Sequence, residues 1–100
     1  MGSVFRQLDN TTEELLTASE STEIVRMTIA NVETADTIVH VNIFKNSKTG
    51  NTARIVGYNS EIAGYEMMTL TNIHLNEGQY LTITTDGAID VDINYKPLTT

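Results

Sequence analysis

Oxygen-bearing side chains recur at every second position near the C-terminus, at Asp90, Asp92 and Asn94. Carboxylate and amide oxygens are the ligands that Ca²⁺ prefers, and this spacing matches the first ligand positions of an EF-hand loop. Such a loop also requires glycine where Tyr95 stands and a glutamate at a position after Thr100. Because alternate residues of a strand share a face, the three side chains are predicted to form a polar row on the outside of a strand.

Candidates for catalysis are few. The two histidines, His40 and His74, have no cysteine or further histidine near them at the spacing of a metal site. The serines fall in predicted turns or near the N-terminus, without the glycines of a nucleophile elbow. Adjacent carboxylates such as Glu13 and Glu14 suit glycoside hydrolysis only when a fold places them across a cleft, and no pattern indicates this. We therefore predict a protein that is not an enzyme, with no catalytic residues, no metal and no cofactor.

Two tyrosines suggest a different kind of site. Tyr58 and Tyr65 lie on either side of a predicted loop, NSEIAG. Tyrosine rings present flat apolar faces with a polar group at one end, which suits stacking on sugars. The alternative reading of the sequence is therefore a ligand-binding site at Tyr58 and Tyr65, in a carbohydrate-binding or receptor-binding module.

Charge and composition limit the partners. Thirteen acidic residues against six basic ones give a formal net charge of −7, and the basic residues are dispersed. A binding surface for a phosphate backbone needs clustered positive charge, so nucleic acid is not an expected partner. No leader pattern opens the chain, and no apolar run approaches the roughly 20 residues of a membrane-spanning helix, so no membrane partner is expected. The absence of cysteine excludes disulfides.

The elements that position these residues are predicted to be strands. The stretch 73–95 alternates apolar and polar residues, with Leu81 and Ile83 on one face before the dipeptide Asp86-Gly87. Alternation continues after it with Ile89, Val91, Ile93 and Tyr95. Because glycine tolerates the positive φ of a two-residue hairpin turn, we predict a tight turn at Asp86-Gly87 between two strands.

A second predicted hairpin comprises residues 22–32 and 37–45. Its inward positions are Val25, Met27, Ile29, Val39, Val41 and Ile43. The opposite face of the second strand carries Ile38, His40, Asn42 and Phe44. Two large apolar groups on an outer face exceed what a solitary domain needs, so Ile38, His40 and Phe44 are predicted to lie in a subunit interface.

The remaining chain completes an all-β prediction. Residues 13–18 are expected to form a first strand, with a single helical turn as the alternative, and further strands are expected at 52–58 and 65–70. Seven to eight short strands with turn signals between them are typical of an antiparallel β-sandwich or jelly roll, here a single domain over 13–100. In residues 1–12 the apolar residues recur with neither the period of a strand nor that of a helix, so this segment is predicted to be an extended arm. Its Val4, Phe5 and Leu8 are too apolar for a free tail, so the arm is expected to pack on its own domain or on a neighbouring subunit.

Three segments together carry a resemblance to a known group of proteins: EELLTAS, TEIVRMTIANVETADTIVHVNIF and MMTLTNIHLNEGQYLTITTDGAIDVDINY. Over roughly residues 13–96 the chain resembles small virion structural proteins of tailed bacteriophages, of β-sandwich type. The matching positions are Ile24, Val25, Ile29, Asn31, Val39, Val41, Ile43, Ile73, Leu75, Gly78, Leu81 and Ile83. The sequence departs from the pattern at Gln79, where an acidic residue is usual, and at 18–21, where a Pro-Ala-Gly type turn is expected.

The resemblance implies a structural role. Proteins of this kind include capsid decoration or cement proteins, which bind the outer capsid lattice and stabilise it, and tail or neck accessory proteins. It implies a protein made in the host cytoplasm and located at the capsid surface of the virion, with the major capsid protein as its partner. It also implies a homo-oligomer, which we expect to be a trimer because oligomer symmetry can match that of the lattice.

Overall fold

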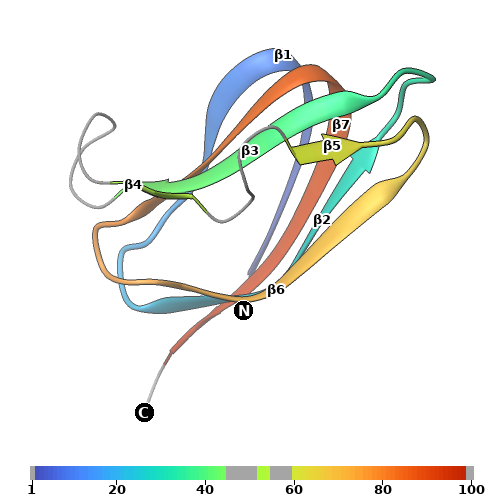
Figure 1. Cartoon of the computed structure of the whole chain (residues 1–100). Coiled ribbons are helices and arrows are strands. Elements are labelled where there is room, and N and C mark those ends of the chain that lie inside the picture. Colours follow the sequence, from blue (N-terminus) through green and yellow to red (C-terminus); the bar gives the residue numbers. More distant parts are fainter. Residues whose placement is uncertain (1, 45–51, 55–59, 99–100) are drawn as a thin grey trace.

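The computed structural model describes residues 2–44, 52–54 and 60–98, and every regular element within them is a strand. The strands are β1 (Gly2–Thr17), β2 (Thr22–Asn31), β3 (Thr37–Phe44), β4 (Thr52–Arg54), β5 (Ser60–Ile62), β6 (Met67–Leu75) and β7 (Tyr80–Pro97). All of them pair antiparallel in one curled sheet (Figure 1). The all-β prediction is confirmed. The described residues contain no helix that could cross a membrane.

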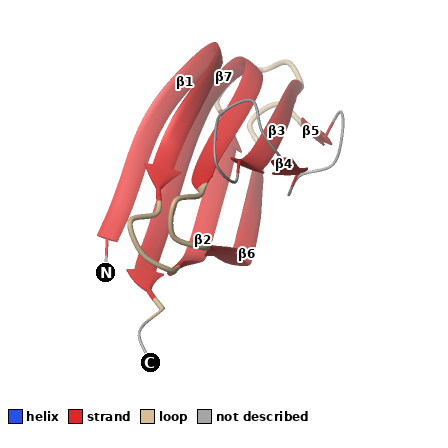
Figure 2. Ribbon diagram, turned by 90° about the vertical axis from the view of Figure 1, so that its left-hand side faces the viewer, coloured by secondary structure: helices blue, strands red, loops and turns tan. Residues whose placement is uncertain are grey.

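The sheet is built around β7, which has 18 residues. Along one side β7 pairs with β1 over nearly its whole length. Along its other side the first half of β7 pairs with β3 up to Thr85, and the second half pairs with β2 from Ile89 onward. The sheet therefore divides into two branches at residues 85–89, which we call the branch point. Figures 1 and 2 show β1 and β7 arching together across both branches.

The hairpin turn predicted at Asp86-Gly87 is wrong, because β7 runs through these residues as one strand. A two-residue turn there would place Ile83 opposite Asp90 and so put apolar and charged residues on one face. The continuous strand keeps every odd-numbered residue on the core side instead. The buried positions on this side are Leu81, Ile83, Thr85, Gly87, Ile89, Val91 and Ile93.

Gly87 allows β7 and the start of β3 to pack closely together. A Cβ at Gly87 would lie 2.5 Å from the Thr37 Oγ1 atom, so only glycine lets the start of β3 approach β7 this closely. Side chains replace the missing ladder bonds: the Ala88 N–H donates to a Glu33 carboxylate oxygen at 3.0 Å, and the Ile38 N–H donates to Asp86 Oδ1 at 2.8 Å. These two bonds keep the Ala88 and Ile38 N–H groups paired where β7 changes partner.

The core lies between the two branches, on the concave side of the sheet. Besides the β7 residues above, its apolar members are Leu8, Leu15, Ala18, Ile24, Met27, Ile29, Val39, Val41, Ile62, Ile73 and Leu75. Val25, predicted to face inward, is 41% exposed. The register between β2 and β7 shifts between Ile24 and Arg26, so Val25 is a β-bulge residue and Ile24 takes the inward position.

The N-terminal segment is part of the sheet. From Gly2 onward, the residues predicted to form an arm over 1–12 belong to β1 and pair with β7 of the same chain. The strand expected at 13–18 is confirmed up to Thr17, and the helical alternative is wrong. β1 is irregular near Asn10, whose φ is 48°, and an exposed ion pair of 3.4 Å between Arg6 and Glu13 joins its two halves. With 16 and 18 residues, β1 and β7 are far longer than the short strands predicted.

Candidate functional site

One branch of the sheet forms a four-strand layer, made of the first half of β1, the second half of β7, β2 and β6. Paired residues share a face, so the pairings give rows of side chains across the outer face of this layer. One row consists of Phe5, Asp92, Thr28 and Thr69, and the next of Gln7, Asp90, Ala30 and Met67. In these two rows the outer face has Asp90, Asp92 and Thr28 in its centre and one large apolar side chain at each edge.

The two apolar side chains at the edges are well exposed. Phe5 on β1 is 57% exposed and Met67 on β6 is 66% exposed. Isolated apolar residues on a surface are ordinary. These two, however, lie on opposite edges of one layer and on the same face, which makes them candidates for contacts with another protein.

Both edges of the layer offer backbone groups as well as side chains. Within the described residues β1 pairs with β7 alone, and β6 pairs with β2 alone. Unpaired strand edges can add a further strand, and proteins usually block them with charges, prolines or bulges. β6, with the sequence MMTLTNIHL, has no acidic residue, lysine, arginine or proline, and its one irregular residue is Asn72, with a φ of 59°. Among the described residues the edge of β6 is therefore open to pairing from Met67 to Thr71.

The predicted interface residues of the N-terminal segment differ in how far they are exposed to solvent. Phe5 is exposed, and Val4 is half-buried against the core. Leu8 is 5% exposed and packs inside the core, so it offers no surface to a neighbouring subunit. Of the three, Phe5 has the most surface available for an interface.

The predicted interface residues of β3 lie on the other branch of the sheet. Ile38 and His40 are half-buried on the side of β3 that faces away from the core, and Asn42 on the same face is buried. The side chain of Phe44 lies outside the described residues. β3 pairs with the first half of β7, whereas Phe5 pairs with Asp92 in the second half. The sequence-predicted interface residues are therefore not brought into one patch.

The two tyrosines of the predicted sugar site are not seen together, because Tyr58 lies outside the described residues. Tyr65 is 72% exposed in the turn before β6 and has a φ of 61°. Its N–H donates to the Glu33 carbonyl oxygen at 3.0 Å, which attaches this turn to the end of β2. Of these two tyrosines, only Tyr65 is among the described residues, and its ring is exposed at this end of the sheet.

The row of Asp90, Asp92 and Asn94 lies on the outer face of β7, as predicted, with all three side chains half-buried. Across the described residues no group of three or more histidine, aspartate or glutamate side chains is placed to hold a metal ion. The neighbours of Asp92 in its row are Phe5 and Thr28. The row therefore acts as the polar centre of the outer face.

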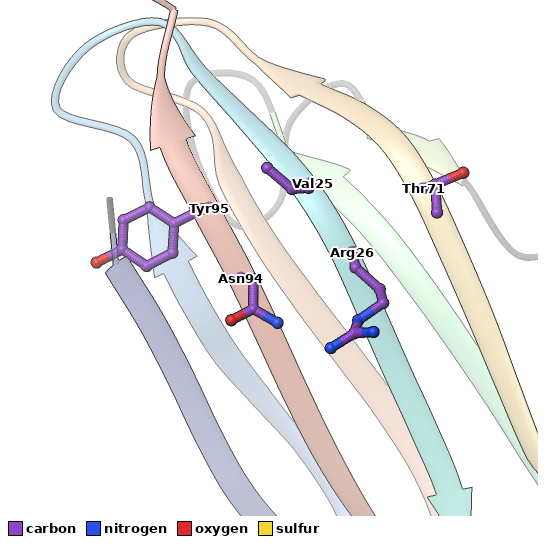
Figure 3. Close-up of a pocket in the computed structure, with 5 residues that line it drawn as sticks. All are labelled: Val25, Arg26, Thr71, Asn94 and Tyr95. Carbon is purple, nitrogen blue, oxygen red and sulfur yellow. The ribbon is translucent and has the colours of Figure 1, made fainter.

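An open groove of about 370 Å³ was not foreseen from the sequence. Its lining consists of Val25, Arg26, Thr71, Asn94 and Tyr95 (Figure 3). In Figure 3 the guanidinium group of Arg26 extends from β2 towards Asn94 on β7. The bulge at Val25 turns this residue outward and creates the apolar side of the groove. Beside it, Arg26 presents donors that suit a carboxylate.

Comparisons of this chain with family models, with curated proteins and with solved structures found no match.

Proposed function

We propose that this chain is a non-enzymatic structural protein of a tailed-phage virion, a capsid decoration protein that binds the major capsid protein as a homotrimer. The observation that carries the assembly role is the four-strand layer, whose two open edges each have an exposed apolar side chain, Phe5 and Met67. The phage and capsid parts of the proposal are supported by the sequence resemblance over residues 13–96. In this proposal the curled sheet corresponds to the β-sandwich that the resemblance implies.

The physical properties of the chain suit such a role. A net charge of −7 makes free copies repel one another, which limits unspecific association before the shell is complete. A shell presents the same site many times, and a symmetric oligomer can engage several sites at once. Modest contacts then add up, because each further contact is made at a high effective concentration.

The direct test is co-sedimentation of the purified protein with capsids assembled from the major capsid protein of the same genome. We expect the protein to move with the capsids through a sucrose gradient and to raise their melting temperature. A protein that stays at the top of the gradient at every concentration tested contradicts the capsid role. Deletion of residues 1–12 is not a suitable test, because these residues form much of β1 and include the core residue Leu8.

A carbohydrate-binding module is the second candidate, supported by the 72% exposure of Tyr65. It predicts retention of the protein on a glycan column and loss of retention in Tyr65→Ala. Val25→Ala is a suitable control, because Val25 is exposed in the layer away from the turn that holds Tyr65. An unmodified protein that passes through the column without delay excludes this candidate.

A further inference from the structure

We propose that copies of this chain join head to tail, with the free edge of β1 in one copy pairing antiparallel with the free edge of β6 in the next. This inference rests on the proposed homo-oligomer and names its contact surfaces. It uses both open edges of the four-strand layer, so that the layer of one copy continues into the layer of the next.

The strand directions permit this arrangement. β1 is antiparallel to β7, β7 to β2, and β2 to β6. β1 and β6 therefore run in opposite directions at the two edges of the layer. When copies are repeated by rotation about an axis to which the strands are inclined, β6 of one copy meets β1 of the next in antiparallel orientation, with the outer faces on the same side. The inclination lets β1 of the next copy shift along β6 by two residues, so that Phe5 meets Met67 instead of Thr69, the residue of its own row.

The side chains select a register in which Phe5 lies opposite Met67 of the next copy. Both side chains belong to the outer face and both are exposed, so the contact covers an aromatic ring with a thioether. On the core side the same register places Val4 opposite Met68 of the next copy. Val4 and Met68 are each half-buried and packed against the core of their own chain, so the contact extends the core across the boundary.

Charge complementarity supports the same register. The next pair consists of Arg6 and Glu66 of the next copy, two exposed side chains of opposite sign. Arg6 also lies 3.4 Å from Glu13 of its own chain, so it would be shared between the two carboxylates. β6 itself has no acidic residue, lysine or arginine to oppose the charges of β1. The register thus matches apolar with apolar on both faces and adds an ion pair at its end.

Pairings between identical edges fit less well. If β1 paired with β1 about Phe5, each Arg6 would lie opposite a Val4, and pairing about Arg6 would set two guanidinium groups opposite each other. Pairing of β6 with β6 would leave Phe5 exposed and the edge of β1 unused. Head-to-tail pairing uses both edges with one kind of contact, and such contacts form a ring when the rotation closes.

Cysteine cross-linking tests the inference directly, because the chain has no cysteine of its own. Opposite residues in an antiparallel pair have Cα atoms about 4.5 to 5.5 Å apart, a separation that disulfides accept. Phe5→Cys and Met67→Cys are prepared separately, mixed, oxidised mildly and analysed on a non-reducing gel. We expect a disulfide-linked dimer in the mixture and none in either variant alone. The double variant is expected to form linked species of up to three chains.

A mixture of Thr28→Cys and Met67→Cys is the matched control, because Thr28 lies in the same row as Phe5 but on a central strand. This control is expected to stay unlinked. Linkage within either single variant would overturn the inference in favour of pairing between identical edges, and the absence of linkage in the Phe5 and Met67 mixture would overturn it altogether. Capsid co-sedimentation is measured independently, so binding to capsids without this linkage would reject the edge pairing while leaving the proposed function in place.

Discussion

Asn31 is the side chain whose replacement tests the structure most sharply. It is 2% exposed and lies at the end of β2. Its amide nitrogen donates to the carbonyl oxygens of Ala35 and Ile62, both at 2.8 Å, and its amide oxygen accepts the Glu33 N–H at 2.9 Å. One side chain therefore connects β2, the turn to β3 and the end of β5.

The cost of losing these contacts follows from their number. Each hydrogen bond contributes about 1 kcal/mol net, and a buried group left without a partner adds to the loss, so Asn31→Ala is expected to cost about 3 kcal/mol of unfolding free energy. For a domain of this size 1 kcal/mol corresponds to roughly 4 to 8 °C in Tm, which gives a decrease of about 12 to 24 °C. Asn31→Asp keeps the acceptor but loses both donors, so it is expected to cost about as much or more, because a carboxylate would then face two carbonyl oxygens.

Urea and thermal unfolding followed by circular dichroism measure these changes. The matched control is Asn94→Ala on the outer face of the layer, where a surface change is expected to stay within about 0.5 kcal/mol. A loss below about 1 kcal/mol in both Asn31 variants would refute the role given to this side chain.

Three further changes test other parts of the fold. Deletion of residues 2–12 is expected to abolish cooperative unfolding, measured in urea, because it removes most of β1 and the core residue Leu8; a cooperative transition in the shortened chain would contradict this. Gly87→Ala is expected to cost about 1 to 3 kcal/mol by overpacking, since its Cβ would lie 2.5 Å from Thr37 Oγ1; an unchanged Tm would show that the branch point is looser than described. Ile93→Ala is expected to lower the unfolding free energy by about 2 to 5 kcal/mol, because the side chain is fully buried; a loss under 1 kcal/mol would contradict its place in the core.

Local alternation was enough to predict much of the sheet. The strands β2 and β3 follow from apolar residues two apart, and Met27, Ile29, Val39 and Val41 are buried as predicted. The hairpin predicted between these two strands is wrong, because β2 and β3 pair with different halves of β7 and not with each other. Such patterns indicate which face of a strand is buried, because successive residues of a strand point to opposite faces and the apolar ones share one face. The all-β class and most of the core were therefore available from the sequence.

The error at Asp86-Gly87 came from a local rule that a long-range constraint overrides. Asp-Gly favours a hairpin turn wherever the two flanking strands can pair. Here that turn would oppose Ile83 with Asp90, and this conflict was visible in the sequence. The unbroken alternation from Leu81 to Ile93 was the signal for one long strand.

Other features depend on partner strands and have no signal within a single segment. Val25 became exposed because β2 bulges against β7, which also created the groove beside Arg26. β1 showed no period because its register shifts near Asn10 and again before Leu16, so its buried positions do not follow one alternation. Its interpretation as an arm followed from that missing period.

The native mass of the protein tests the central claim most directly, measured by light scattering over a range of concentrations. Three chains of 11.0 kDa give about 33 kDa, the mass that the account predicts at high concentration. Phe5→Asp is expected to shift the protein to monomers, while Val32→Asp, also an exposed apolar residue but directly after the central strand β2, is expected to keep the trimer. A mass of 11.0 kDa for the unmodified protein at every concentration would contradict assembly through the edges of the four-strand layer.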